Sequence, residues 1–356
     1  MKKICFLGGY GGGVQCGERL VGPQRLSVEL GIRLAKEMDV CFVHLGDKDH
    51  RTTLHELPEI IIRNGAFSFF KTLRAIKKIN PDIIHGHGSL NMAWALFAFK
   101  KLTGKKTIIT FTDFKRNIIN NYSILNKLDA IVVQTEHARQ KLIQQGVHFR
   151  LIKKITYGIE EKFYHSNLCP EIRGISHKIL LYYGDARQER GIHLLLQSLP
   201  HLSPDIFVLL CVRKFEKGFG FEEMKSLSSV RLKVMALSEY PCPIEDIIHS
   251  CDVVVLPFIK NTLEPPLTIM EVSAVGKKLI TSNVGGTAEV ASSGAVILES
   301  ITPFSLAAAI NKEFEQKSMQ KSEQKSGKKS EQSRRQSRRY DWNETVKEIL
   351  ELYRTP

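Results

Sequence analysis

The sequence predicts an α/β protein of two doubly wound domains that face a cleft, and three observations support this fold class. Short β-branched runs alternate with helical patterns along the whole chain, which is typical of parallel sheets with crossover helices. The strand-like runs form two groups, separated by the polar, irregular segment 157–177. The length of 356 residues is enough for two domains, each with its own core.

The first group of strands reads KICFLGG, VCFVHLG, DIIHGHG, TIITFTD and AIVVQT, with helices expected between them, for example over residues 24–38 and 68–79. The second group reads KILLYYG, IFVLLCV, RLKVMAL, DVVVLPF and KLITS. We therefore assign residues 1–165 to an N-terminal domain and residues 166–338 to a C-terminal domain. Ligands of such sheets bind at the carboxyl ends of strands, so both domains should present loops to the cleft.

Two segments near the C-terminus are expected to add helices. Residues 339–356 contain YDWNETVKEILELY, whose apolar residues recur at helical spacing and should pack back on the body of the protein. The stretch 312–339 is rich in Lys, Gln and Ser. A disordered tail is one interpretation of it, but its residue types tolerate helix well, and helix is the favoured one.

The net charge of +14 is concentrated in residues 1–165, which carry 26 Lys and Arg against 14 Asp and Glu. Such an excess suits an anionic membrane surface, an anionic lipid or a nucleic acid, although a solvated face is the simplest interpretation. Nucleic acid is the least favoured partner, because the basic cluster lacks interleaved aromatic residues. The cluster consists of Lys100, Lys101, Lys105, Lys106, Lys115 and Arg116.

Apolar runs and cysteines indicate the compartment. The longest apolar run, MAWALFAF at residues 92–99, is far shorter than the ~18 residues that span a bilayer. The start MKKICFL fits a first strand better than a signal peptide, so we expect a cytoplasmic protein, peripheral on the inner face of the membrane if it binds one. The seven cysteines are scattered and form no CxxC pair, which favours reduced, buried thiols over disulfides or a zinc site.

The most informative segment for function is EPPLTIMEVSAVGKKLITSNVGGTAE at residues 264–289. Glu264 and Glu271 flank a helix start at a Pro-Pro pair, and a Gly-Gly turn with a third acid, Glu289, follows the next strand. Proline at a first helical position leaves the next amides unpaired, and this end of a helix attracts anions. Carboxylates beside an anion suit the hydroxyls of a sugar or ribose, so the segment predicts a pocket for a sugar joined to phosphate.

Two loops suit the same kind of ligand. GGYGGGVQCG at residues 8–17 fits neither the GxGxxG nor the P-loop spacing, which leaves a Gly-rich loop that approaches a ligand closely or an ordinary surface loop. In GDARQERG at residues 184–191, Arg187 and Arg190 lie between a strand and a helix start. They can reach a diphosphate there, and the alternative is a solvated turn with surface arginines.

YYGDARQERGIHLLLQSL and the later CDVVVLPFIKNTLEPPLTIMEVSAVGKKLITSNVGGTAEV together resemble the nucleotide-sugar domain of family-4 retaining glycosyltransferases of GT-B fold. Weaker similarities in DIIHGHG, TEHARQKLIQQGV, YGIEEKFY and YDWNETVKEILELY extend the resemblance over nearly the whole chain. It implies a nucleotide diphosphate sugar as donor. It also implies no metal cofactor, because arginines and amides would stabilise the leaving diphosphate.

The resemblance assigns roles by position. Arg190 stands where the family has the lysine that neutralises the donor diphosphate, and Glu271 stands at the acid that contacts the ribose. We expect Glu264 at the donor sugar, as a catalytic residue with Arg190, although it lies one residue later than the first acid of the family. The other donor-binding residues expected are Gly12, Gly13, Asp185, Arg187, Leu267, Thr268, Gly285 and Gly286.

Several positions depart from the family. Asp185 replaces the usual arginine and would oppose diphosphate binding unless Arg187 substitutes for it. Thr112 replaces a histidine that many relatives have near the reacting centre. His85 and His87 are expected to point to opposite faces of a strand end and so to hold no metal together. The residues expected on the acceptor side are His87, Thr112 and Asp113.

The sequence thus predicts an enzyme that moves a sugar from a nucleotide diphosphate donor to an acceptor, which is a sugar, a lipid-linked sugar or a polysaccharide precursor. Retention of configuration is implied by the resemblance alone. Three alternatives stay open. One is a glycosyltransferase-like protein that binds a nucleotide sugar or a partner without turnover, and another is a nucleic-acid-binding protein that uses residues 312–339. The third is a sugar-nucleotide epimerase on the same fold.

Overall fold

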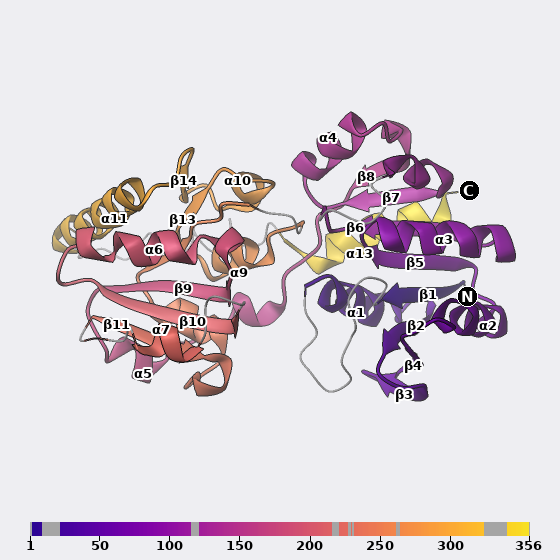
Figure 1. Cartoon of the computed structure of the whole chain (residues 1–356), viewed down its shortest axis with the longest axis horizontal. Helices are drawn as coiled ribbons and strands as arrows, with labels where there is room; N and C mark the ends of the chain where they lie inside the picture. The colour runs from indigo at the N-terminus through magenta and orange to yellow at the C-terminus, as the bar shows by residue number, and fades with distance from the viewer. Residues whose placement is uncertain are drawn as a thin grey trace. The chain divides into compact units, whose positions relative to one another are not determined.

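The chain divides into two compact units (Figure 1). Unit 1 comprises Met1–Gly158, Thr262–Pro265 and Trp342–Pro356, and unit 2 comprises Ile159–Asn261 and Pro266–Asp341. The division after Gly158 falls inside the segment that the sequence marks as a linker. The computed structural model describes residues 2–8, 22–114, 121–215, 221–226, 229, 231–260, 264–323 and 340–355.

Unit 1 is built on an eight-stranded sheet with the order β3-β4-β2-β1-β5-β6-β7-β8. All neighbouring strands in it are parallel except the antiparallel pair of β3 and β4 at one edge. The strands are β1 (Lys3–Gly8), β2 (Asp39–Gly46), β3 (His50–Leu54), β4 (Leu57–Arg63), β5 (Ile83–Gly88), β6 (Lys106–Phe111), β7 (Ala130–Val133) and β8 (Ile152–Lys154). The helices are α1 (Gly22–Leu34), α2 (Ser68–Ile79), α3 (Leu90–Thr103), α4 (Glu136–Gln144), and the 3₁₀ turns η1 (Tyr122–Lys127) and η2 (Phe149–Leu151).

Local signals in the sequence fix the ends of these helices. Both α2 and α3 end at a residue in the left-handed conformation, Asn80 and Gly104, whose amides donate to the carbonyl groups of Ile76 and Lys100. Helix α4 is capped by Thr135, whose hydroxyl accepts from the amide of Ala138 at 3.1 Å. Because helices cover both faces of the sheet, its central strands read as continuous apolar runs.

Unit 2 is built on a six-stranded parallel sheet with the order β11-β10-β9-β12-β13-β14. One hydrophobic core lies on each face of it. The strands are β9 (Ile179–Ala186), β10 (Phe207–Phe215), β11 (Leu232–Ala236), β12 (Val253–Leu256), β13 (Lys278–Ser282) and β14 (Val296–Leu298). The helices are α5 (Pro170–Arg173), α6 (Ile192–Ser198), α7 (Phe221–Ser226), α8 (Ile244–Ser250), α9 (Leu267–Val275), α10 (Thr287–Val290) and α11 (Pro303–Glu323), with the 3₁₀ turns η3 (Glu161–Phe163), η4 (Gln188–Arg190), η5 (Leu199–His201) and η6 (Leu237–Glu239).

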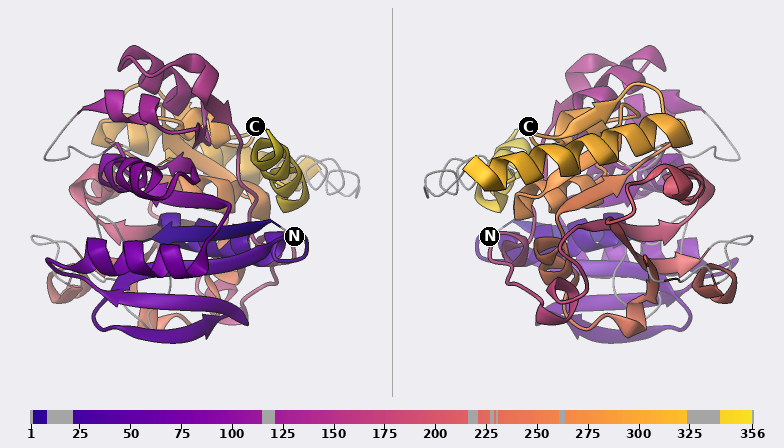
Figure 2. Two further views of the ribbon diagram at one scale, coloured as in Figure 1. Left: turned by 90° about the vertical axis from the view of Figure 1, so that its right-hand side faces the viewer. Right: turned by 90° about the vertical axis from the view of Figure 1, so that its left-hand side faces the viewer.

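These two sheets confirm the predicted class of two doubly wound α/β domains. The C-terminal part of the chain contributes one helix, α11, to unit 2 and a later one to unit 1. Helix α11 runs along unit 2 and packs on α6 and β12 (Figure 2), and it extends into the Lys-, Gln- and Ser-rich stretch as far as Glu323. The rest of that stretch, 324–339, lies outside the described residues.

The last helix, α13 (Trp342–Arg354), returns to unit 1. The rings of Trp342 and Tyr157 lie 5.6 Å apart, and the Tyr353 hydroxyl lies 2.6 Å from Nδ1 of His85 in β5. A β-carbon on Gly158 would lie 2.5 Å from Trp342, so only glycine lets the chain pass this ring. The final helix is therefore part of the core of unit 1.

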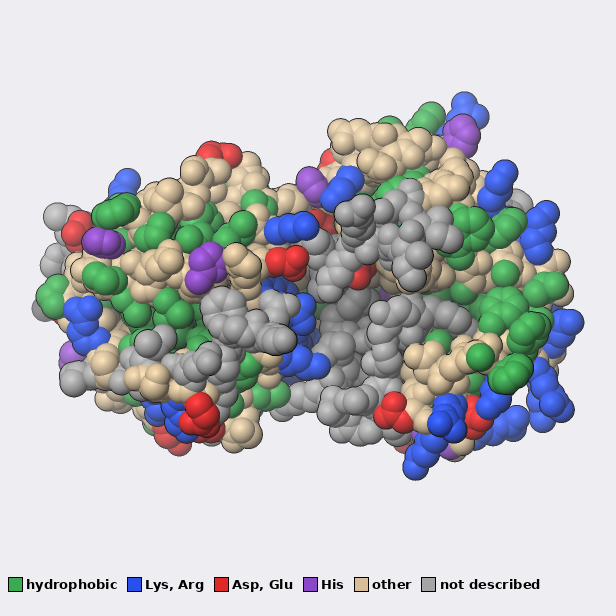
Figure 3. All heavy atoms as spheres, in the orientation of Figure 1, with side chains coloured by type: hydrophobic (Ala, Val, Ile, Leu, Met, Phe, Trp, Pro, Cys, Tyr) green, Lys and Arg blue, Asp and Glu red, His purple; other side chains and the backbone are tan. Residues whose placement is uncertain are grey.

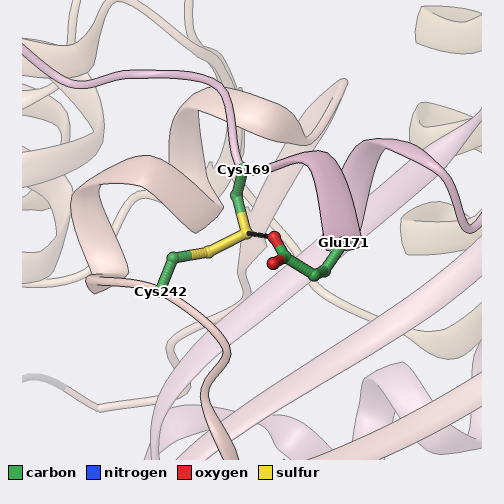
Figure 4. Close-up of side chains that lie close together, drawn as sticks. All are labelled: Cys169, Glu171 and Cys242. Carbon is green, nitrogen blue, oxygen red and sulfur yellow. Dashed lines mark hydrogen bonds between the residues drawn. A yellow bond between two sulfur atoms is a disulfide. The ribbon is translucent and has the colours of Figure 1, made fainter.

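The cysteines correct one expectation. Cys169 and Cys242 form a disulfide in unit 2, with their Cα atoms 6.4 Å apart, and the Glu171 carboxylate lies 3.3 Å from the Cys169 sulfur (Figure 4). The prediction that no cysteines pair is wrong, because the partners lie 73 residues apart and only the fold brings them together. Cys5, Cys41, Cys211 and Cys251 are buried and form no disulfide.

Opening this disulfide should destabilise unit 2. Closing a loop of this length restricts the unfolded chain, so the double variant Cys169→Ser/Cys242→Ser should lose about 2–4 kcal/mol of unfolding free energy. Urea titration with and without a reductant measures the effect. Reductant should lower the stability of the wild type and leave the double variant unchanged. A wild type that is insensitive to reductant contradicts the expectation.

Candidate active site

The carboxyl end of β9 leads directly into a tight turn of unit 2. After Arg187 the chain forms η4 and reaches Gly191, which has φ of +71° and begins α6. A β-carbon at Gly191 would lie 1.8 Å from the carbonyl oxygen of Pro257. The backbone of this turn therefore packs directly against the chain that follows β12, and this contact fixes the position of Arg190.

Arg190 lies between that chain and the start of α9. Its guanidinium carbon is 4.6 Å from the centre of the Phe258 ring, and Nη1 is 3.5 Å from the Thr268 hydroxyl. Burial lowers the pKa of Arg190, and Tyr182 and Asp185 oppose that effect. The guanidinium still remains charged at neutral pH, because the ordinary pKa of arginine is so high. Arg190 is thus a rigid, half-buried cation.

Asp185 has two arginine partners at the end of β9. Arg213 Nε donates to one carboxylate oxygen at 2.8 Å, and Arg187 Nη2 lies 3.1 Å from the other. Burial would raise the pKa of Asp185, but the hydrogen bond from Arg213 and the charges of three arginines outweigh burial and lower it. Asp185 is therefore ionised, and it holds Arg187 and Arg213 in place. One acid among three arginines leaves this end of the sheet positively charged.

Arg213 is a site residue that the sequence analysis missed. It lies in β10, the strand beside β9, and although burial acts against its charge, the hydrogen bond to Asp185 raises the pKa of Arg213. The available signal was a pair of cations, Arg213 and Lys214, near the end of an apolar strand. Only the parallel pairing of the two strands shows that Arg213 reaches Asp185.

The first turn of α9 lies beside Arg190. Its first amides, on Leu267 and Thr268, precede the earliest backbone hydrogen bond of the turn, which Ile269 donates to Pro266 at 2.9 Å. Such amides are available to an anion. One turn later, the Glu271 carboxylate is buried and lies 3.0 Å from the hydroxyl of Tyr183, a second residue that the sequence analysis missed.

Of the four glycines predicted for the donor site, the structure describes two. Gly285 and Gly286 form the turn between β13 and α10, and Gly285 has φ of +60°. Glu289 lies in α10. Gly12 and Gly13 lie outside the described residues. Within unit 2 the structure thus gathers Asp185, Arg187, Arg190, Thr268 and Glu271 around the ends of β9 and β10 and the start of α9.

Glu264 belongs to unit 1. Its amide donates to the carbonyl oxygen of Thr112 at 2.8 Å, and the Thr135 hydroxyl donates to its carboxylate at 3.1 Å. The carboxylate is buried at the carboxyl ends of β6 and β7. The hydroxyl of Thr112 is also buried, and no described residue supplies it with a hydrogen-bond partner. Asp113 follows it, half-buried. Unit 1 thus has its own polar group of predicted residues.

His85 and His87 correct a second expectation. Residues two apart in a strand share a face, and the two rings stack with their centres 4.7 Å apart, so the prediction of opposite faces is wrong. His87 Nε2 lies 3.2 Å from the Tyr157 hydroxyl, and His85 Nε2 lies 2.8 Å from the Thr110 hydroxyl. Burial, more than neighbouring histidines, lowers the pKa of both rings, that of His87 to about 3. Both are therefore neutral hydrogen-bonding groups.

Comparison with known proteins gives two matching family models. Glycosyltransferase Family 4 matches residues 22–163, and Glycosyl transferases group 1 matches residues 173–332. D-inositol 3-phosphate glycosyltransferase from Corynebacterium urealyticum is 22% identical over 317 residues, which cover 78% of this chain and 72% of the relative.

Solved structures similar to this chain include HepE from Anabaena in complex with UDP-glucose, with a TM-score of 0.75, 16% identity and 99% of each chain covered. Sucrose-phosphate synthase from Thermosynechococcus elongatus has a TM-score of 0.78 at 16% identity, covering 99% of this chain and 98% of the other. These likenesses show the fold, with its two parallel-sheet units. Because the two family models match successive parts of the chain, the protein belongs to the GT-B glycosyltransferases of family 4 and group 1.

Proposed function

We propose that this glycosyltransferase moves a hexose from a nucleotide diphosphate donor to a sugar or lipid-linked acceptor, with retention of configuration. The observation that carries the proposal is the group of Arg187, Arg190 and Arg213 around Asp185, beside the first turn of α9. Cations and free amides in such an arrangement suit the two phosphates of the donor. The complex of the similar Anabaena protein with UDP-glucose supports a donor of this class.

The same groups would stabilise the transition state more than the bound donor. Negative charge on the leaving diphosphate grows as the glycosidic bond breaks, and Arg190 is held rigidly by Phe258 and Thr268. Glu271 suits the ribose hydroxyls. We assign Glu264 to the donor sugar and His87, Thr112 and Asp113 to the acceptor. Arginines in this role make a metal ion unnecessary, so transfer should persist in a chelator.

Donor binding is the first experiment. A thermal-shift screen with UDP-, GDP- and ADP-sugars should identify one nucleotide that raises the melting temperature, because a ligand of the folded state adds about 2.7 kcal/mol at about 100 times its Kd. Transfer or hydrolysis of that donor is then measured. The absence of a shift with every nucleotide sugar would overturn the donor site.

A second candidate is a protein that binds a nucleotide sugar without turnover. It is motivated by Asp185 at the predicted diphosphate site and by Thr112 in place of a histidine. Equal, undetectable turnover in the wild type and in Arg190→Ala, together with donor binding by the wild type, would favour this candidate.

Arg213 provides a specific prediction for the donor site. Replacing it with alanine should weaken donor binding by about 10–100-fold, since a hydrogen-bonded charge on a phosphate contributes about 1.5–3 kcal/mol. Isothermal titration of the nucleotide diphosphate measures the loss. The matched control is Lys214→Ala, which removes the neighbouring exposed cation. Equal affinity in Arg213→Ala and the wild type would show that Arg213 neither contacts the diphosphate nor shields it from Asp185.

A further inference from the structure

Two neighbouring helices of unit 1 expose aromatic side chains. Phe67, at the N-cap of α2, is 72% exposed, and Phe70 in its first turn is 65% exposed. On α3, Trp94 is 37% exposed and Leu102 is 50% exposed. Figure 3 shows hydrophobic side chains gathered over α2 and α3 with Lys and Arg side chains beside them. The "α2–α3 surface" consists of Phe67, Phe70, Arg74, Lys77, Lys78, Trp94, Lys101 and Leu102.

Helical spacing explains why these side chains share one direction. Phe67, Phe70 and Arg74 recur every three to four residues on one side of α2, while Thr72 and Ile76 on the other side are buried. One of the exposed rings, Phe70, also belongs to a chain of aromatic contacts. Phe70 contacts Phe69 edge to face, and the Phe69 ring stacks on Phe99 of α3 at 5.0 Å. The aromatic contacts thus join α2 to α3.

The charges on the two helices themselves have one sign, although Asp49 pairs with Lys71 of α2 and Asp129 pairs with Lys100 of α3. Residues 63–81 contain five Lys and Arg and no acid, and residues 89–112 contain four Lys and no acid. No described acid lies within ion-pair distance of Arg74, Lys77 or Lys78. A face of cations and large apolar side chains needs a partner that offers both anionic groups and an apolar interior.

The basic cluster expected from the sequence is partly used inside unit 1. Lys100 pairs with Asp129 at 2.8 Å, and Lys106 donates to the carbonyl oxygen of Leu352 at 3.2 Å. Lys115 and Arg116 lie outside the described residues. The cations on the outward face of α2 are therefore better candidates to bind an anionic partner than Lys100 and Lys106.

We infer that the α2–α3 surface docks on an anionic lipid bilayer. The aromatic rings would enter the interface between headgroups and acyl chains, and the cations would contact lipid phosphates. No helix within the described segments is both long and apolar enough to cross the bilayer. A single-stranded nucleic acid fits less well, because it needs a groove that follows its backbone, and this surface is the outside of two helices. The use of docking, to reach a lipid-linked acceptor, rests on the proposed function, but docking itself does not.

Vesicle sedimentation without any donor tests the inference. The protein should sediment with vesicles of phosphatidylcholine mixed with phosphatidylglycerol, and far less with phosphatidylcholine alone. The variants Phe67→Ser/Phe70→Ser and Arg74→Glu/Lys78→Glu should each lower the partition coefficient by about tenfold or more. The matched controls lie in unit 2: Phe304→Ser, at a ring that is 68% exposed, and Arg231→Glu/Lys233→Glu, with the same charge change.

Trp94 provides a direct reading of insertion. The chain has two tryptophans, and Trp342 is buried at 5% exposure, so a blue shift of the emission on anionic vesicles reports Trp94. Melting temperatures equal to that of the wild type show that the surface variants fold. A nucleotide-sugar thermal shift that is unchanged in these variants separates docking from the donor site.

Three outcomes would overturn the inference. The first is no sedimentation of the wild type with anionic vesicles. The second is equal binding by the wild type and both surface variants. The third is a loss in Arg74→Glu/Lys78→Glu but not in Phe67→Ser/Phe70→Ser, together with salt-sensitive binding of single-stranded RNA that the same cations support. That pattern assigns the surface to a nucleic acid.

Discussion

Replacing Arg190 with alanine should lower kcat/KM for sugar transfer by about 10²–10³-fold, comparable to removing one preorganised transition-state donor in other enzymes. Arg190 is half-buried, stacked on Phe258 and close to the hydroxyl of Thr268. Its charge is therefore already in place before the diphosphate leaves.

Steady-state transfer assays with the donor found in the thermal-shift screen measure this loss. Arg190→Lys should recover part of the rate, because it keeps the charge without the forked geometry. Arg231→Ala, a cation of unit 2 outside the proposed site, should leave the rate unchanged. If Arg190→Ala turned over like Arg231→Ala, Arg190 would have no part in the reaction.

Gly191→Ala should cause the largest loss of stability among single substitutions in the site. The left-handed backbone, with φ of +71°, costs an L-residue about 1–2 kcal/mol, and the new β-carbon would lie 1.8 Å from the Pro257 carbonyl oxygen. Because that neighbour is backbone, the turn must move, and the total cost should exceed about 3 kcal/mol.

Gly146→Ala separates the two contributions. Gly146 has a similar φ of +81°, but nothing lies within 4 Å of its β-carbon position. Its substitution should cost only about 1–2 kcal/mol in chemical denaturation. Moving the turn also moves Arg190, so Gly191→Ala should lose donor binding under conditions in which it is still folded. Equal costs for the two variants would show that the close approach to Pro257 is easily relieved.

The sequence predicts the sheets of both units well because their strands are buried on both faces and read as apolar runs. It does not predict the edge hairpin of unit 1, β3 and β4, whose turn places His55 and Glu56 at φ of 49° and 67°. These residues give no turn signal, since hairpins of this kind favour Asn-Gly or Asp-Gly.

The candidate site is predictable to the extent that its residues are close in the chain. GDARQERG and the start of α9 identify Arg190 and Glu271. The pairing of Asp185 with Arg213 depends on two strands 28 residues apart, and the contact of Glu264 with Thr135 depends on residues 129 apart. No local pattern records either contact, because each arises from the packing of the sheet.

Because α13 returns to unit 1, the core of unit 1 can be completed only after α13 has been synthesised. Tyr353, which contacts His85, and Trp342, which packs on Gly158, leave the ribosome only after the residues of unit 2. Although domains generally fold in N-terminal order during translation, unit 1 lacks part of its core until α13 has been made. A protein that stops at Gly158 should expose this core and aggregate, and a fusion that joins residues 342–356 to residues 1–158 should aggregate less.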